Sequence, residues 1–416
     1  MLKQVMVSLF IVSSLFSNIV LAKAHYTDAT NEQIQMSEEQ NSARDVSVQI
    51  DQYYSPMVGG DLMITTMRGY QALDNFIPTS AGDRSGPLIL GRLAKLVVIE
   101  GTVVGLQMVT QHEVFGHGFR AREFHVPTHY HITPWSGATY LNAFKYNQLS
   151  LSEQAALETG GLEATTLLAK QLRNRWIKSD TIDSREAQLY FESNLDQTLY
   201  ILNTRLYKDG RVAGNGHDVV AYINTVNEWY QRPVLTACRL RKQVLLDFLD
   251  PYLFYSLYSM GNYIIDGEQS FEYPMINIGE YRYLPAARMV LAPYGPEYQL
   301  NNFIKGPEHT IQAAIRYGNT GGRISSGLTL ETTRLISSDL LTIDGRADVW
   351  NQPKLFRANA GLSRAAFGGA LSLIARYKIA SCVEIMGQAG YKTSGYIPGE
   401  VLKHSPILRI GFSAFL

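Results

Sequence analysis

ILRIGFSAFL, residues 407–416, alternates apolar and polar side chains with a period of two. Leu408, Ile410 and Phe412 would share one face of an extended strand, while Arg409 would point to the other face. About nine such segments, each of roughly ten residues, occupy the last third of the chain and predict an antiparallel sheet. The clearest other examples are residues 310–317, 341–349, 371–379 and 383–391.

The length and the polar second face of these segments fit two kinds of sheet. A tilted strand that crosses a membrane needs about 9 to 11 residues, and the inner face of a membrane barrel is polar. A soluble antiparallel sandwich also alternates, so the pattern alone leaves both architectures open. The last strand, which ends on Phe415 and Leu416, resembles the C-terminal strand of bacterial outer-membrane barrel proteins. This resemblance implies an antiparallel β-barrel at residues 266–416, with about eight to ten strands.

Upstream of these segments, between residues 46 and 265, the apolar residues recur at helical spacing. Loops rich in Gly, Pro and Asp separate the helical stretches. The sequence therefore predicts an α+β protein, in which a mainly helical domain at residues 46–265 precedes the barrel. The candidate helices cover residues 88–115, 150–176, 184–206 and 218–230.

The first 24 residues have the pattern of a secretory signal peptide. Lys3 precedes an apolar stretch, and an Ala-Lys-Ala cleavage site ends at residue 24. Residues 25–45 form a polar leader, and no later segment reaches the roughly 20 apolar residues of a membrane helix. We therefore expect an exported protein, and together with the barrel this places it at an outer membrane.

Composition excludes several classes of protein. The 37 basic and 37 acidic residues give a net charge of zero, so no basic surface favours nucleic acid as a partner. The 25 tyrosines suit surfaces that are apolar on one side and wet on the other. Cys238 and Cys382, the two cysteines, are too few for a disulfide scaffold or a four-cysteine zinc module and leave one disulfide open.

The stretch HEVFGH, residues 112–117, carries the clearest sign of chemistry. Neutral imidazoles bind Zn2+, and a carboxylate beside the first one can take a proton from a metal-activated water. On a regular helix, residues five apart diverge by about 140°. His112 and His117 can therefore share a metal only if the helix loosens by a π-bulge or ends between them. Gly116 and Gly118 permit such a departure.

This stretch resembles the His-Glu-x-x-His helix of zincin metallopeptidases, in the longer form with three residues between Glu and His. Its continuation through Arg122 is similar to the Gly-His-x-x-x-Ala-Arg run of site-2-type proteases. The resemblance implies a Zn2+ metallopeptidase that hydrolyses polypeptides. His112 and His117 would be metal ligands, and Glu113 would be the catalytic base.

A third ligand has to come from another segment. Glu163 lies in TGGLEATT, residues 159–166, which is otherwise uncharged, and a buried carboxylate needs a partner. Gly160 and Gly161 would let this helix approach the histidine helix closely. Zincins with a glutamate as third ligand carry it on a downstream helix, so the resemblance implies Glu163, with Glu158 in reserve.

Two further groups of residues are candidates for the site. His129 and His131 would share one face of a strand and could line the cleft, or they could be ordinary surface residues. The pair His217-Asp218 begins a candidate helix and could add a residue to the site.

We therefore predict a zinc metallopeptidase anchored in or at a bacterial outer membrane, whose lipid and a polypeptide substrate are its partners. One alternative is a non-enzymatic outer-membrane barrel, acting as pore, adhesin or assembly factor, with the helical region as a plug. The other keeps the zinc but makes the substrate a lipid or a cell-wall amide. The side of the membrane and the oligomeric state are left open by the sequence.

Overall fold

The computed structural model describes residues 45–77, 80–206, 212–213, 217–357, 359 and 365–415. The described residues belong to one compact unit, which combines helices with a large antiparallel sheet. The predicted α+β class is therefore confirmed. The predicted signal peptide and polar leader fall outside the described residues, apart from Asp45. Cys238 and Cys382 are exposed and do not pair with each other.

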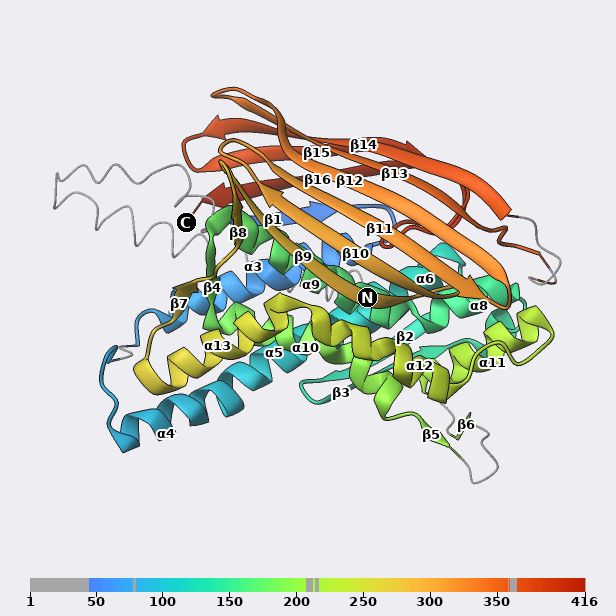
Figure 1. The fold of residues 1–416 in the computed structure, drawn as a ribbon, viewed down its shortest axis with the longest axis horizontal. Helices are drawn as coiled ribbons and strands as arrows, with labels where there is room; N and C mark the ends of the chain where they lie inside the picture. The colour runs from blue at the N-terminus through green and yellow to red at the C-terminus, as the bar shows by residue number, and fades with distance from the viewer. Residues whose placement is uncertain are drawn as a thin grey trace. The chain divides into compact units, whose positions relative to one another are not determined.

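A ten-stranded sheet forms one layer, in the order β1-β16-β15-β14-β13-β12-β11-β10-β9-β8. β1 comes from the start of the described chain and pairs with β16 near its end, with Val48 opposite Phe412 (Figure 1). The strands are β1 (Asp45–Ile50), β8 (Ile276–Ile278), β9 (Tyr281–Ala292), β10 (Gly295–Lys305), β11 (Thr310–Thr320), β12 (Arg323–Ser337), β13 (Leu341–Pro353), β14 (Ala365–Ala380), β15 (Val383–Lys392) and β16 (Ser405–Phe415).

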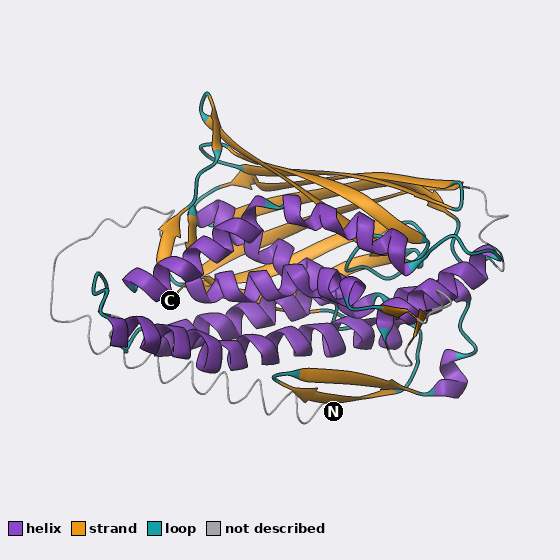
Figure 2. Cartoon of the chain, turned by 60° about the horizontal axis from the view of Figure 1, so that its bottom comes forward, coloured by secondary structure: helices purple, strands orange, loops and turns teal. Residues whose placement is uncertain are grey.

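The helices lie on the concave side of the sheet (Figure 2). They are α3 (Pro56–Asp74), α4 (Gly86–Ala94), η2 (Lys95–Glu100), α5 (Gly101–Thr110), η3 (Gln111–His117), α6 (Gly118–Glu123), α7 (Ala143–Tyr146), α8 (Leu151–Glu158), α9 (Gly160–Ser179), α10 (Ser184–Leu202), α11 (Asp218–Tyr230), α12 (Ala237–Val244), η4 (Leu245–Leu249) and α13 (Pro251–Asp266). Small two-stranded pairs are β2 (Thr128–Thr133) with β3 (Ser136–Leu141), β4 (Thr181–Asp183) with β7 (Ser270–Glu272), and β5 (Arg205–Leu206) with β6 (Val212–Ala213). Among the described helices, none is both long and apolar enough to cross a bilayer.

The two faces of the sheet differ in the way that the period of two predicts. Side chains toward the helices are polar or charged and buried, as at Arg316, Asp348 and Arg409. The alternate positions are apolar and exposed. Those more than 40% exposed on the outer face include Ile315, Tyr317, Leu330, Val349, Leu371, Leu373, Ile385, Leu408, Ile410 and Phe412.

The described strands do not close into the expected barrel, because β1 and β8 remain the two edges of the sheet. Helix side chains bond to the free backbone of β1 and of β9, which β8 pairs only at residues 281–283. The Ser47 N–H donates to Thr65 Oγ1 of α3 at 3.1 Å, and that hydroxyl donates to Ser47 O at 2.7 Å. Gln197 of α10 likewise accepts from Leu291 N–H at 3.3 Å and donates to Met289 O at 2.7 Å on β9. Backbone groups satisfied in this way do not need a further strand.

Candidate metal centre

The two histidines lie on one continuous helical run, from α4 through η2, α5 and η3 to α6. Within η3 the chain is a π-helix, and the Gly118 N–H bonds to the carbonyl of Glu113, five residues back. Residues five apart fall close to the same side of a π-turn. His112 and His117 therefore face the same point, and the expected loosening of the helix between them is confirmed.

Glycines on two helices allow the histidine segment to be buried against α9. A Cβ on Gly116 would lie 2.5 Å from Gly161 Cα, and a Cβ on Gly161 would lie 2.2 Å from His112 Nε2. Neither position has room for a side chain. The close approach of the Gly160-Gly161 helix that the sequence predicts is thus present, with the ring of His112 packed against the bare backbone.

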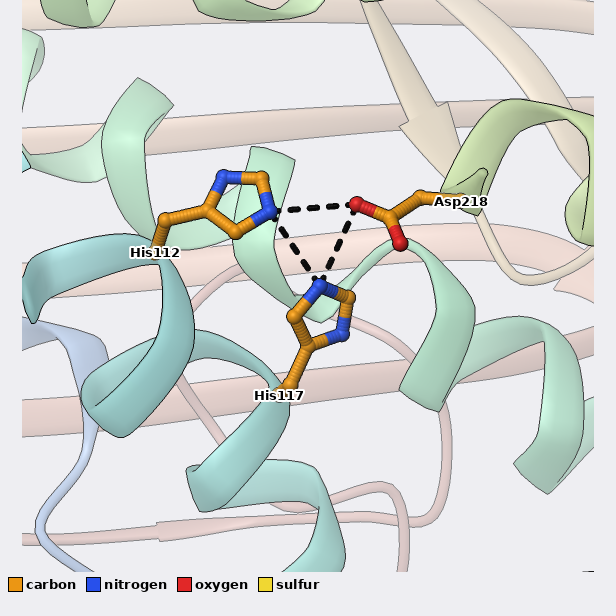
Figure 3. A group of neighbouring side chains, drawn as sticks. All are labelled: His112, His117 and Asp218. Carbon is orange, nitrogen blue, oxygen red and sulfur yellow. Dashed lines mark hydrogen bonds and ion pairs between the residues drawn. The ribbon is translucent and has the colours of Figure 1, made fainter. Parts of the chain in front are cut away.

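Asp218 completes a group of three side chains with the histidines (Figure 3). Its Oδ2 lies 3.1 Å from His112 Nε2 and 3.2 Å from His117 Nε2, and the two Nε2 atoms are 3.2 Å apart. Ligands bound at 2.0–2.1 Å to tetrahedral zinc are separated by about 3.3 Å. Two imidazoles and one carboxylate are a zinc donor set that leaves a fourth position for water or substrate. Both the donors and their separations fit zinc.

Each histidine uses its other ring nitrogen to hold its orientation. His117 Nδ1 donates to the carbonyl of Leu157 at 2.7 Å, and His112 Nδ1 lies 2.9 Å from Asp196 Oδ2. The Asp196 carboxylate is itself held by Thr165 Oγ1 at 2.9 Å. Because Nδ1 donates in each ring, the neutral form of each histidine has the Nε2 lone pair toward the shared point, which is the arrangement of metal-binding histidines.

The charges of the group reinforce one another. Burial disfavours a charged His112, but Asp196 and Asp218 raise its pKa well above the usual value. Burial also opposes the charge on Asp218, and the imidazoles of His117 and His112 outweigh it, so that the pKa of Asp218 lies well below its usual range. Asp218 sits in the first turn of α11, where the helix dipole favours a negative charge. A cation at this point would take the place of protons.

Glu113 is buried beside the group and is held by the β2–β3 hairpin. Thr139 Oγ1 donates to Glu113 Oε2 at 2.7 Å. A Cβ on Gly137 would lie 2.6 Å from Glu113 Cγ, so the hairpin backbone covers this side chain directly. Burial disfavours a charged His117, but Asp218, and more weakly Glu113, raise its pKa above the usual value. The carboxylate therefore lies within electrostatic range of the candidate ligands and has a fixed orientation.

Glu163, the expected third ligand, is not brought to the histidines. Its Oε1 and Oε2 accept from Arg120 Nη2 at 2.7 and 2.8 Å, and Oε1 also accepts from the Gly399 N–H at 2.6 Å. Arg120 is fully buried. The carboxylate does have the partner that its burial requires, but the partner is this guanidinium, and Asp218 takes the place beside the histidines.

Glu158, the reserve ligand, also lies outside the group. Its Oε1 accepts from Thr225 Oγ1 at 2.8 Å and from the Tyr146 hydroxyl. Burial raises the pKa of Glu158 to about 7.

Substitutions of Glu163 and Asp218 should separate the structural role of the first from the metal-binding role of the second. Glu163→Gln leaves Arg120 without its charge partner and is expected to lower the free energy of unfolding by about 3 kcal/mol, while zinc content stays unchanged. Asp218→Asn removes a donor and is expected to lose the zinc. Chemical denaturation and elemental analysis of both variants would check this. Loss of zinc in Glu163→Gln with retention in Asp218→Asn would restore Glu163 as the ligand.

The other residues considered from the sequence have different surroundings. His129 and His131 are exposed on β2, and the His129 ring stacks on Tyr140 at 4.9 Å. Tyr200 of α10 stacks on His112 at 5.4 Å and meets the His217 ring at 5.3 Å. Asp196, Thr139 and Tyr200 also surround the group, and no sequence pattern indicated them. The only sequence signal for Asp218 was its position at the start of a candidate helix.

The fold and this group define an α+β protein with a two-histidine, one-aspartate candidate metal centre on a π-helix. Comparison of the chain with known protein families, with curated proteins and with solved structures found no match.

Proposed function

We propose that the protein is a zinc-dependent peptidase held in a bacterial outer membrane by the outer face of its sheet. The observation that supports the chemistry best is the triangle of His112 Nε2, His117 Nε2 and Asp218 Oδ2, with both Nδ1 atoms committed to acceptors behind the rings. Side chains arranged in this way are organised for a cation before it binds.

When bound, zinc would polarise the scissile carbonyl and make water a stronger nucleophile near neutral pH. Glu113 would accept the proton of the attacking water and return it to the leaving amine. Thr139 would keep the Glu113 carboxylate in position through its hydrogen bond. Asp196 would keep the His112 ring from turning. The side chain of Asp218 is 20% exposed, against 5% for His112, so the substrate would approach from the Asp218 side.

The outer face of the sheet supports the proposed location. Soluble monomers rarely expose contiguous apolar patches larger than a few hundred Å2, and here apolar side chains follow one another from β10 to β16. β15 has 10 residues and β14 has 16, which is sufficient for a tilted crossing of the hydrocarbon layer. Buried charged residues such as Arg316, Asp348 and Arg409 lie on the opposite face, away from the proposed lipid contact, and the exposed Arg334 and Lys378 lie near the ends of their strands.

Glu113→Gln tests the proposed chemistry most directly. The amide keeps the size of the side chain but cannot take a proton, so we expect cleavage of a casein substrate to fall by at least about 100-fold. Zinc content should not change, because Glu113 is not a ligand. Glu228→Gln, an exposed glutamate on α11, is the matched control and should keep full activity. Equal turnover in Glu113→Gln and the wild type would contradict the proposal, as would cleavage of lipid or cell-wall amides in place of peptides.

A further inference from the structure

A second apolar face lies on the helices, away from the sheet. On the run from α4 to α5 it consists of Leu90, Leu93, Val97, Val98, Ile99 and Leu106, each at least 40% exposed. Val98 is the central member, at 62%. We call this set, together with the exposed apolar residues of α13 described below, the helical apolar face.

The polar residues of the same run are turned inward. Glu100 is completely buried, and Arg92 is 5% exposed. Lys95 pairs with Asp74 at 2.5 Å and with Glu100 at 3.4 Å, in the interior. A helix at the surface of a water-soluble protein has the opposite arrangement, with charges outward and aliphatic residues inward. The outer side of this run is therefore an apolar surface.

Helix α13, next to α4, also presents apolar side chains outward, in addition to Leu253, Met260 and Tyr263 on its buried side. Phe254, Leu257, Tyr258 and Ile265 are all at least 46% exposed, while Ser256 and Ser259 are buried. Arg92 joins the two helices, because its Nη1 donates to the carbonyl of Ile265 at 3.0 Å. The two outward rows of apolar residues thus belong to one surface, and Figure 1 shows α4 and α13 side by side.

We infer that the helical apolar face contacts the acyl chains of a lipid bilayer, as a membrane surface separate from the sheet. Leu90 and Leu106 are 16 positions apart, which corresponds to about 24 Å of helix and is close to the apolar band of about 25 Å on outer-membrane proteins. The exposed residues of the run are aliphatic, whereas the cores of protein–protein interfaces are enriched in Tyr, Trp, Met and Arg.

Charge at one end of the face fits the same partner. Lys242 of α12 is exposed and precedes the exposed Leu245 and Phe248 of η4, which lead into α13. Arg239 and Arg241 of the same helix are half-buried and donate to the backbone carbonyls of Asn319 and Thr204. The exposed ammonium group of Lys242, at the boundary of an apolar surface, is positioned for the phosphates of anionic lipids. With a bilayer on this side, the helical apolar face would complete the apolar surface around the protein, of which the open sheet forms one part.

Spin labels at single cysteines test this contact in the full-length protein, reconstituted into vesicles of phosphatidylethanolamine and phosphatidylglycerol. Cys238→Ser and Cys382→Ser provide the background, and Val98→Cys and Leu257→Cys carry the labels. We expect both labels to collide with oxygen at least about fivefold more often, relative to a water-soluble nickel complex, than a label at Glu228→Cys. Circular dichroism and zinc content would confirm that each variant is folded.

The collision rates of the labels distinguish lipid, water and protein as the surroundings of the helical apolar face. Labels at Val98 and Leu257 that behave like the label at Glu228 would place the helical apolar face in water and overturn the inference. Labels shielded from both oxygen and nickel would indicate a protein partner or a second copy and would also overturn it. A label at Leu373→Cys reports the sheet face separately, so failure of the proposed anchoring is distinguished from failure here.

Discussion

Replacing His112 by alanine is expected to abolish zinc binding, from about one equivalent per chain in the wild type to none. The variant loses one of the three donors that converge within 3.2 Å of one another. It also leaves Asp218 facing a single imidazole. Elemental analysis of protein purified in detergent would give the stoichiometry of both forms.

The control for this variant is His131→Ala, which removes an exposed histidine of β2 and should keep all of the zinc. Thermal unfolding would show whether His112→Ala is folded. Zinc retained at full stoichiometry in a folded His112→Ala variant, or absent from the wild type, would remove the metal centre and the proposed chemistry with it.

Gly161→Ala is expected to disable the same centre without changing a ligand. The added methyl would lie 2.2 Å from His112 Nε2 and 2.6 Å from Cε1. The ring cannot easily retreat, since Asp196 holds Nδ1 and Tyr200 stacks on it at 5.4 Å. We expect zinc affinity to fall by at least about 100-fold, which is about 2.7 kcal/mol. The free energy of unfolding should fall by about 1–3 kcal/mol through overpacking.

A competition titration against a zinc chelator would measure this change. Gly69→Ala is the matched control, because this α3 glycine is also helical but has nothing within 4 Å of the added methyl. The control should bind zinc normally and gain up to about 1 kcal/mol from its higher helix propensity. Unchanged affinity in Gly161→Ala would mean that the ring has room to move and is not held as described.

The strands could be predicted because their signal is local. Arg409 alternates with Leu408 and Ile410, and the structure turns the first inward and the other two outward. Whether the sheet closes into a barrel or stays open could not be predicted in the same way. It depends on Thr65 and Gln197, which reach the sheet edges from distant helices and satisfy backbone groups that further strands would otherwise pair.

The candidate site likewise contains residues that the sequence could predict and residues that it could not. His112, Glu113 and His117 lie within one short segment, so their chemistry and the need for a loosened helix follow from spacing alone. Asp218 joins them only through the packing of α11, which no local pattern reports. A buried Glu163 does need a partner, and Arg120 meets that need as fully as a metal would.

The pairing of β1 with β16 has a consequence for how the chain reaches its final form. Residues 45–50 can find their partners only after residues 410–415 are available. A chain made from its N-terminus must therefore hold β1 unpaired until β16 has been made. Contacts of such high sequence separation slow folding, and an exposed strand edge invites association with other chains during the delay. Shortening the chain by its last ten residues would make that exposure permanent.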